Sequence, residues 1–212
     1  MKRIGILGGT FDPVHLGHLV PAQYACNFLG LDSLLLVPSA SPVHRPRHVP
    51  ASAQDRVAMC RLATASLPGF DVSEIETARH DPSYTVLTLR SLRATLGPAA
   101  DLVLLVGDDN LPLLHTWWHA REVIDLATIA VLPRPVAAAP DLAALREAFG
   151  HTAVDAILAR RVPAPLVAIS GTDIRNRVRS GLPITGLVPK TVAAHIAANM
   201  LYAFIGESEP QD

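Results

Sequence analysis

The sequence I-G-I-L-G-G-T-F-D-P-V-H-L-G-H, residues 4–18, determines the fold of this chain. Its first residues form a short apolar run that predicts a buried strand at about 3–7. A glycine pair and a loop follow the strand, and an apolar periodic stretch then predicts a helix over 16–29, closed by Gly30. Strand, glycine turn and helix form a βα unit, where free backbone N–H groups and the helix dipole favour phosphate binding.

Two histidines mark the entrance of the predicted helix. His15 and His18 are three positions apart, so they project from nearly one face. Gly17 lies between them and adds no side chain, which would let a ligand approach the backbone. A glycine pair alone is usually only a tight turn, and a single histidine is more often a surface residue. Their combination with Thr10 in one strand–loop–helix is a much more specific signal.

Short apolar runs and helical patterns alternate along the rest of the chain. We expect further strands at 33–37, 70–75, 101–106, 128–132, 157–161 and 166–169. We expect further helices from a Ser52 cap to about 67, from a Ser83 cap to Leu96 (with Val86, Leu89, Leu92 and Leu96 on one face), at 141–149, after Ser170, and at 189–200.

The alternation of strands and helices defines the fold class. It predicts an α/β fold with a doubly wound, Rossmann-like parallel sheet, helices on both faces and a small C-terminal helical part. No internal repeat or low-complexity linker divides the sequence, so we expect one domain over 1–206. The acidic residues 207–212 are expected to form a disordered tail.

Composition argues against several function classes. The formal net charge is −1 and no long basic run occurs, so bulk nucleic-acid binding is not indicated. No run of about 18 uninterrupted apolar residues appears, so we expect no membrane span. Cys26 and Cys60 are too few for a disulfide framework. The apolar run of the first strand follows Met1-Lys2-Arg3 directly, so we expect no signal peptide. We therefore expect a cytoplasmic protein with reduced thiols.

Polar and aromatic residues follow several predicted strands, at the carboxyl ends where open α/β sheets bind ligands. The run D-D-N at 108–110 could cap a helix, or it could hold a ribose or a metal. The tryptophan pair at 117–118 could pack in the core or offer a face to a flat ring. The loop 38–50 is either a stiff surface loop with solvated charges or part of a ligand site.

A second candidate phosphate site lies near the C-terminus. Ser170 and Thr172 end a predicted strand and open a helix, and Arg175 lies one turn further on the same side as Thr172. Two hydroxyls, free N–H groups and a guanidinium suit a phosphate, which arginine can bind in a bidentate manner. The alternative is a helix-capping serine beside an exposed arginine.

These stretches resemble a known family. G-G-T-F-D-P-x-H-x-G-H resembles the signature of the nucleotidyltransferases that join a nucleotide to a phosphorylated acceptor, and I-S-G-T-D-I-R at 169–175 resembles their second signature, usually I-S-S-T-x-I-R. Gly171 replaces the second serine, which removes one hydroxyl and leaves a backbone N–H. From about residue 3 to 200 the chain is similar to bacterial nicotinate mononucleotide adenylyltransferases. Similar motifs lie at 42–45, 82–85, 107–109, 116–118 and 134–135.

The resemblance implies transfer of AMP from ATP to nicotinate mononucleotide, and it assigns roles by motif. The implied catalytic residues are His15, His18 and Arg175. The implied ATP-binding residues are Gly8, Gly9, Thr10, Phe11, Gly107, Asp109, Ser170 and Thr172, with Asp109 on the ribose. The implied acceptor-binding residues are His44, Arg45, Thr85, Trp117, Trp118 and Arg134.

The chemistry implied by this reaction is simple. The acceptor phosphate is already an anionic nucleophile at pH 7, so no general base is needed. The barriers are repulsion between anions and misalignment, which positioning and positive charge can lower. Mg²⁺ is expected to bind with ATP and to keep several waters, so we expect no metal site made of protein ligands alone.

Other functions remain open at this point. The acceptor could be nicotinamide mononucleotide or phosphopantetheine, because the sequence does not show which donors face it. A nucleotide-sensing regulator has less need of the cationic residues. A Rossmann dehydrogenase is disfavoured, since the glycines of residues 5–9 do not follow G-x-G-x-x-G and no acidic residue ends the second strand. Monomer and homodimer are both compatible with the sequence.

Overall fold

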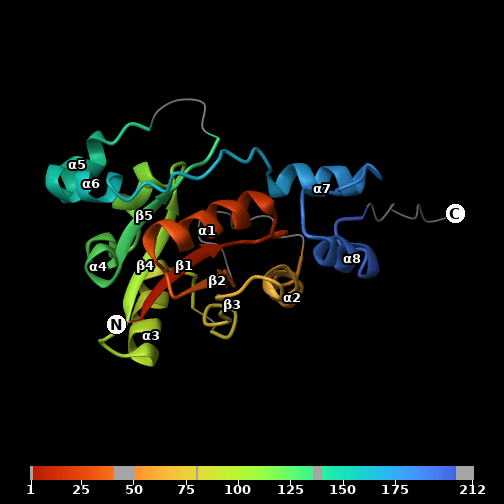
Figure 1. Ribbon diagram of the computed structural model, residues 1–212, viewed down its shortest axis with the longest axis horizontal. Coiled ribbons are helices and arrows are strands. Elements are labelled where there is room, and N and C mark those ends of the chain that lie inside the picture. Colours follow the sequence, from red (N-terminus) through yellow and green to blue (C-terminus); the bar gives the residue numbers. More distant parts are fainter. Residues whose placement is uncertain (1, 41–50, 80, 136–139, 204–212) are drawn as a thin grey trace, which may run out of the picture.

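A five-stranded sheet forms the centre of the computed structural model, which describes residues 2–40, 51–79, 81–135 and 140–203 (Figure 1). The strands are β1 (Arg3–Gly9), β2 (Ser33–Pro38), β3 (Phe70–Val72), β4 (Asp101–Gly107) and β5 (Thr128–Leu132). Their order is β3-β2-β1-β4-β5, and every neighbouring pair is parallel. The predicted doubly wound parallel sheet is confirmed.

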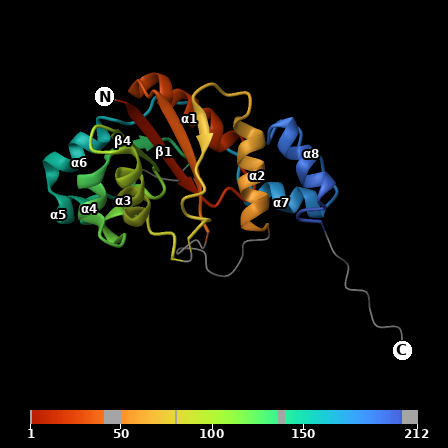
Figure 2. The same ribbon diagram turned by 90° about the horizontal axis from the view of Figure 1, so that it is seen from below.

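Helices cover both faces of the sheet. They are α1 (Leu16–Leu29), α2 (Ala53–Thr64), α3 (Thr85–Leu96), the 3₁₀ helix η1 (Leu111–Thr116), α4 (Ala120–Leu126), α5 (Ala143–Phe149), α6 (His151–Leu158), α7 (Gly171–Arg179) and α8 (Lys190–Ala198). Figure 2 shows α1 and α3 on opposite sides of β1 and β4, with α2, α7 and α8 together at one end. The small C-terminal helical part is therefore α7 with α8.

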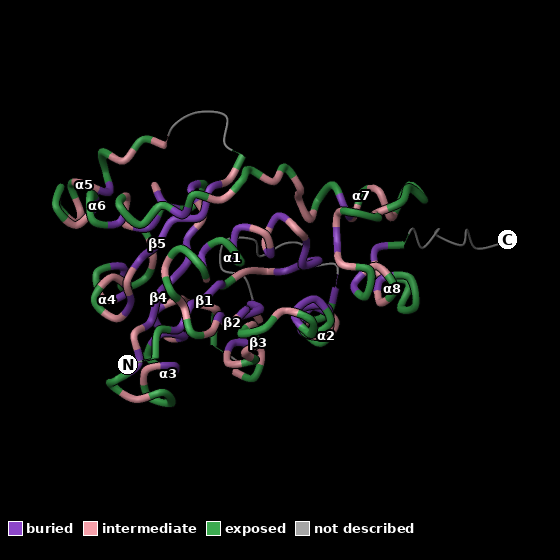
Figure 3. The backbone as a smooth tube through the Cα atoms, in the orientation of Figure 1, coloured by how far each residue is buried: buried purple, intermediate pink, exposed green. Residues whose placement is uncertain are grey.

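Alternating strand residues divide the core into two clusters. On β4, Val103 and Leu105 belong to the cluster under α1, α2, α7 and α8, whereas Leu104 and Val106 belong to the cluster under α3 to α6. Both faces of the strands are buried, and exposed residues lie mainly on the outer sides of the helices (Figure 3). A parallel sheet covered on both faces needs nearly continuous apolar strands, as this sequence provides.

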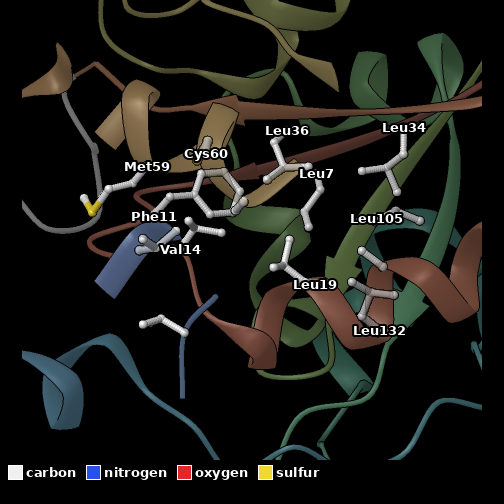
Figure 4. Close-up of a cluster of buried hydrophobic side chains, with 14 of the residues drawn as sticks. Leu7, Phe11, Val14, Leu19, Leu34, Leu36, Met59, Cys60, Leu105 and Leu132 are labelled. Carbon is white, nitrogen blue, oxygen red and sulfur yellow. The ribbon is translucent and has the colours of Figure 1, made fainter. Parts of the chain in front are cut away.

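The first cluster also anchors the loop after β1. The Phe11 ring is 1% exposed and lies among Val14, Met59 and Cys60 (Figure 4). The loop is thus fixed to α2 by hydrophobic packing before the chain enters α1.

Most predicted elements are confirmed, but two strands are wrong. The segment 157–161 instead ends α6, and only Arg161 forms a bridge, with Val131. The segment 166–169 is an extended connection in which Leu166 is 64% exposed. A short apolar run does not distinguish a strand from a helix face, and here Val154 and Ile157 are buried as one face of α6.

Helix ends show which capping predictions hold. Ser52 caps α2 as predicted, because its Oγ accepts the backbone N–H of Asp55 at 3.0 Å. The Ser83 cap is wrong: α3 begins after Tyr84, and the Ser83 hydroxyl accepts instead from the backbone N–H of Ala40 at 3.0 Å. Leu96 is also not part of the buried face, since it lies at the end of α3 and is 40% exposed.

Within the part of the chain that the structure describes, no helix has the length and apolar character needed to cross a membrane.

Cys26 and Cys60 are both free thiols, and burial raises the pKa of Cys26 to about 11. The predicted tail at 207–212 lies outside the described residues.

Candidate active site

A cavity of about 740 Å³ lies at the carboxyl ends of the central strands. β1 pairs with β2 on one side and with β4 on the other, so connections leave toward opposite faces and a crevice opens between their ends. The lining comes from β1 with its following loop, the start of α3, β4, η1, the segment after β5, and the start of α7. Its polar and aromatic members include Thr10, His15, His18, Glu76, Tyr84, Thr85, Thr88, Asp109, Trp117, Trp118, Arg134, Ser170, Thr172 and Arg175.

His15 and His18 stand side by side at the start of α1. Their rings stack with centroids 3.8 Å apart and planes 27° apart. The backbone N–H of His15 donates to Nδ1 of His18 at 3.3 Å. Because Nδ1 of His18 acts as an acceptor, the proton of its neutral ring lies on Nε2. The prediction that both imidazoles project from one face is confirmed.

Both imidazoles are neutral in the ligand-free protein. Burial, followed by the charge of Arg134, lowers the pKa of His15 to about 3. Burial is also the main cause that lowers the pKa of His18, with smaller contributions from His15 and Arg134. At neutral pH these rings offer hydrogen bonds rather than charge, and nearby arginines supply the positive charge of the cavity.

Gly17 serves packing, which corrects the sequence-based explanation. A Cβ at this position would lie 2.9 Å from Nδ1 of His15 and 3.0 Å from the carbonyl oxygen of Ile169. The space is therefore already filled by protein atoms. Gly17 also accepts a hydrogen bond at 2.7 Å from Nη1 of Arg134 through its carbonyl oxygen. The glycine lets α1 approach the segment before α7.

Arg175 reaches from α7 back to the loop after β1. Its Nη1 donates to the carbonyl oxygen of Asp12 at 2.6 Å, and its Nη2 donates to Oγ1 of Thr172 at 3.2 Å. Residues 163 positions apart thus meet, and Arg175 lines the same cavity as both histidines. Ser170 caps α7, because its Oγ accepts the backbone N–H of Asp173 at 3.1 Å. The capping interpretation of this serine is confirmed, and Ser170 also lines the cavity; its role at a phosphate stays a prediction.

Arg134 lies next to the histidines, and Asp109 lies beside Arg134. A Cβ on Gly107 would clash with Oδ1 of Asp109 and would come within 3.3 Å of Nε of Arg134. Burial lowers the pKa of Arg134, and the charge of Asp109 opposes this shift. The resemblance placed Arg134 among the acceptor-binding residues; in this structure its neighbours are Gly17, whose carbonyl oxygen it binds, the two histidines and Asp109.

Aromatic side chains also line the cavity. The rings of Tyr84 and Trp118 have centroids 4.8 Å apart. Trp118 is 45% exposed, while Trp117 is half-buried against the core under α3 to α6. The two tryptophans therefore differ: the ring of Trp117 packs against the core, whereas the ring of Trp118 is open to a ligand. Thr85 begins α3 beside them.

Two predicted site residues, His44 and Arg45, lie outside the described residues. A third, Phe11, presents no free side chain to the cavity. The ring of Phe11 is buried in the core and in edge contact with His18 at 5.1 Å, so its backbone is the part left to face the cavity.

The described residues contain no group of three histidine, cysteine, aspartate or glutamate side chains placed to hold a metal ion.

Known proteins match the chain over nearly its whole length. The family model described as Cytidylyltransferase-like matches residues 6–177. A protein of Herpetosiphon aurantiacus named "Probable nicotinate-nucleotide adenylyltransferase" is 40% identical over 202 residues, which cover 95% of this chain and 99% of the relative. A Pseudomonas syringae pv. tomato protein of the same name is 41% identical over 210 residues, covering 95% and 94%. The chain belongs to the nicotinate-nucleotide adenylyltransferases of the cytidylyltransferase-like family.

A solved structure shares the fold. The Plasmodium falciparum nicotinic acid mononucleotide adenylyltransferase complexed with NaAD has a TM-score of 0.71 at 15% identity, with 95% of this chain and 98% of that chain covered. The family resemblance and the fold class expected from sequence are both confirmed.

The departure of this adenylyltransferase from the second family signature has a structural reason. A Cβ at Gly171 would lie 2.9 Å from the carbonyl oxygen of Asp12 and 3.3 Å from Nη1 of Arg175. The glycine therefore leaves room for the hydrogen bond between Arg175 and Asp12. The chain lacks one hydroxyl at this position, and the backbones at Gly171 and Asp12 approach each other closely instead.

Sequence reasoning missed several buried polar residues around the site of this adenylyltransferase. Asp12 stands in the quoted opening stretch but was assigned no role, and it is 6% exposed. Arg56 is 1% exposed and donates to the carbonyl oxygens of Thr10 at 2.9 Å and Ser39 at 2.6 Å. The sequence feature that could have indicated Arg56 is its position as a charged residue on the apolar face of α2. Tyr202 had no sequence signal, because its partner is 190 positions away.

Proposed function

We propose that this chain transfers the adenylyl group of ATP to nicotinate mononucleotide, producing nicotinate adenine dinucleotide and pyrophosphate. The observation that carries the proposal is the shared cavity, which His15 and His18 line from the start of the chain and Arg175 from near its end. The names of relatives at 40% and 41% identity point to the same reaction. The cavity volume of about 740 Å³ is within the ordinary range for nucleotide-sized ligands.

We assign the two ends of the cavity to the two substrates. The glycine turn after β1, Asp109 and the start of α7 receive ATP, because backbone N–H groups and a helix N-terminus favour phosphates. Tyr84, Thr85 and Trp118 receive the pyridine ring, since an open indole offers a face for stacking. Arg134 lies beside His15 and His18, so we place it near the reacting phosphates.

The reaction needs no proton transfer. A phosphate oxygen of the acceptor attacks the α-phosphorus of ATP and forms a new P–O bond. The bond from the α-phosphorus to the oxygen bridging to the β-phosphate breaks, and its electron pair leaves with pyrophosphate. Catalysis is therefore alignment together with stabilisation of negative charge.

The side chains at the junction supply that stabilisation. Nε2–H of His18 donates a hydrogen bond to a phosphate oxygen, and Arg175 and Arg134 contribute fixed positive charge. A nearby anion favours the protonated form of an imidazole. Bound triphosphate thus raises the pKa of both histidines, which burial keeps low in the ligand-free protein.

A divalent cation, which we take to be Mg²⁺, accompanies ATP. When bound, it neutralises part of the triphosphate charge. The described residues offer no cluster of ligands for it, which fits coordination by phosphate oxygens and water.

The test measures pyrophosphate release from ATP and Mg²⁺ with each of three acceptors supplied separately: nicotinate mononucleotide, nicotinamide mononucleotide and phosphopantetheine. We expect release with nicotinate mononucleotide far above the other two. Higher turnover with another acceptor would overturn the substrate assignment. Binding of ATP by equilibrium dialysis without pyrophosphate release with any acceptor would support a nucleotide-sensing regulator instead.

A further inference from the structure

A buried hydrogen-bonded chain connects the C-terminal end of the described fold to Arg175. Tyr202 follows α8 and is 7% exposed, and its hydroxyl donates to Oδ1 of Asp12 at 2.7 Å. The other carboxylate oxygen of Asp12 lies 3.7 Å from Nη1 of Arg175. The same Nη1 donates to the carbonyl oxygen of Asp12 at 2.6 Å. Asp12 therefore contacts Tyr202 and Arg175 at once.

The environment of Asp12 makes the hydroxyl of Tyr202 important. A carboxylate that is 6% exposed has little access to water, so it depends on protein donors. Burial is the main cause that raises the pKa of Tyr202, so the phenol keeps its proton and remains a donor. Removing this hydroxyl would take away the donor that the structure shows for Oδ1 of Asp12.

We propose that Tyr202 is a positioning residue for adenylyl transfer, which through Asp12 holds the guanidinium of Arg175 at the phosphate side of the cavity. This inference rests on the proposed function. Arg175 touches the cavity, whereas Tyr202 acts through the residue that anchors it.

Two further features show that the anchor is built for close geometry. Gly171 provides the space in which Arg175 approaches the backbone of Asp12. Arg56 holds the neighbouring backbone by donating to the carbonyl oxygens of Thr10 and Ser39. With the loop fixed at Thr10, a change at Tyr202 is transmitted to the carboxylate of Asp12 and to Arg175.

The alternative is that Tyr202 only fills the core, since it packs in the cluster that contains Ile196 of α8. The variant Tyr202→Phe separates the two explanations, because it keeps the ring and removes the hydroxyl. Tyr24→Phe is the matched control, since Tyr24 is 46% exposed on α1 and does not line the cavity. Ile196→Val controls for loss of packing in the same cluster.

The experiment measures kcat, the KM values and the melting temperature of these variants. We expect Tyr202→Phe to lower kcat about 10-fold and to raise KM for ATP, while KM for nicotinate mononucleotide stays within about 2-fold. Tyr24→Phe and Ile196→Val should retain wild-type kcat, the latter with a lower melting temperature. In an Arg175→Lys background, adding Tyr202→Phe should change kcat by less than about 2-fold, because coupled residues are not additive.

Binding of a non-hydrolysable ATP analogue provides a readout that does not depend on turnover. Tyr202→Phe should raise the Kd for this analogue about 5-fold and leave the Kd for adenosine unchanged, because Arg175 lies on the phosphate side. Wild-type kcat and analogue affinity in Tyr202→Phe, or full additivity with Arg175→Lys, would overturn the inference. Wild-type protein that releases no pyrophosphate would refute the proposed function, while the binding measurement would still decide the role of Tyr202.

Discussion

The two ring nitrogens of His18 have different environments, and this difference determines what the residue can do. Nδ1 accepts the backbone N–H of His15 at 3.3 Å, which leaves Nε2 as the donor toward the cavity. Sequence spacing predicted that both imidazoles share a face. The low pKa values were not predictable, because they depend on Arg134 and on burial by distant segments.

The His18→Ala variant tests the chemical role of this donor. We expect kcat to fall on the order of 10²-fold or more, the scale observed when one transition-state donor is removed. His18→Gln should retain more activity than His18→Asn, because the glutamine amide reaches nearer to the Nε2 position. His151→Ala, at an exposed position on α6, is the control. Near-normal turnover of His18→Ala in a pyrophosphate-release assay would remove His18 from the chemistry.

The lowered histidine pKa values also predict how stability depends on pH. The ordinary pKa of 6.5 applies to the unfolded chain, whereas folding lowers the pKa of His15 to about 3. Between these values the unfolded state binds more protons, so stability is full above about pH 6.5 and falls as the pH decreases. Each such histidine contributes a loss of up to about 1.4 kcal/mol per pH unit in this window.

Urea denaturation of ligand-free protein at pH 7 and pH 5 measures this effect. The double variant His15→Gln/His18→Gln should lose less of its free energy of unfolding between the two pH values than the wild type loses. An equal loss in both proteins would show that folding does not lower the pKa of the two rings.

At the scale of elements, two helices with the same cap differ in what their N-termini face. Ser52 caps α2 and Ser170 caps α7, each by accepting the backbone N–H three residues further on, at 3.0 Å and 3.1 Å. Of these two serines, only Ser170 is among the described residues that line the cavity. The same local structure therefore serves stability alone in α2, and we infer that it serves both stability and phosphate binding in α7.

Paired alanine variants separate these contributions. Ser52→Ala and Ser170→Ala should each lower the free energy of unfolding by about 1 kcal/mol, the usual cost of a lost N-cap. Only Ser170→Ala should also lower kcat/KM for ATP. Chemical denaturation and steady-state kinetics of the two variants provide the comparison. Equal kcat/KM values in both variants would remove the Ser170 side chain from the ATP site.

The elements that sequence predicted best are those with local signals. The strand at β1, the helix α1 and its Gly30 end were predictable because apolar period and turn residues lie within one short stretch. The segment 157–169 was not, because its apolar residues pack as one face of α6 or lie in an exposed connection, and long-range contacts decide between these states. The Tyr202–Asp12 contact was unpredictable for the same reason.

At the scale of the whole molecule, the cavity joins parts that are far apart in the sequence. Its lining includes the start of α7, where we propose that the phosphates bind, and the start of α3, where we propose that the pyridine ring binds. These helices lie on different clusters of the core, with Ile174 in one and Val86 in the other. A ligand that fills the whole cavity therefore connects the two halves of the fold, whereas a ligand that fills one end contacts one half.

Hydrogen–deuterium exchange can resolve this difference by region. Nicotinate adenine dinucleotide should slow amide exchange both at 84–88 and at 170–175, because it contacts both helix starts and stabilises the folded state of each. AMP should slow exchange at 170–175 and leave 84–88 close to the free protein, whereas nicotinate mononucleotide should protect 84–88. Residues 143–149 of α5, which are not among the described residues that line the cavity, provide an internal control that no ligand should change. Protection of 84–88 by AMP, with 170–175 unaffected, would mean that the two ends of the cavity are assigned the wrong way round.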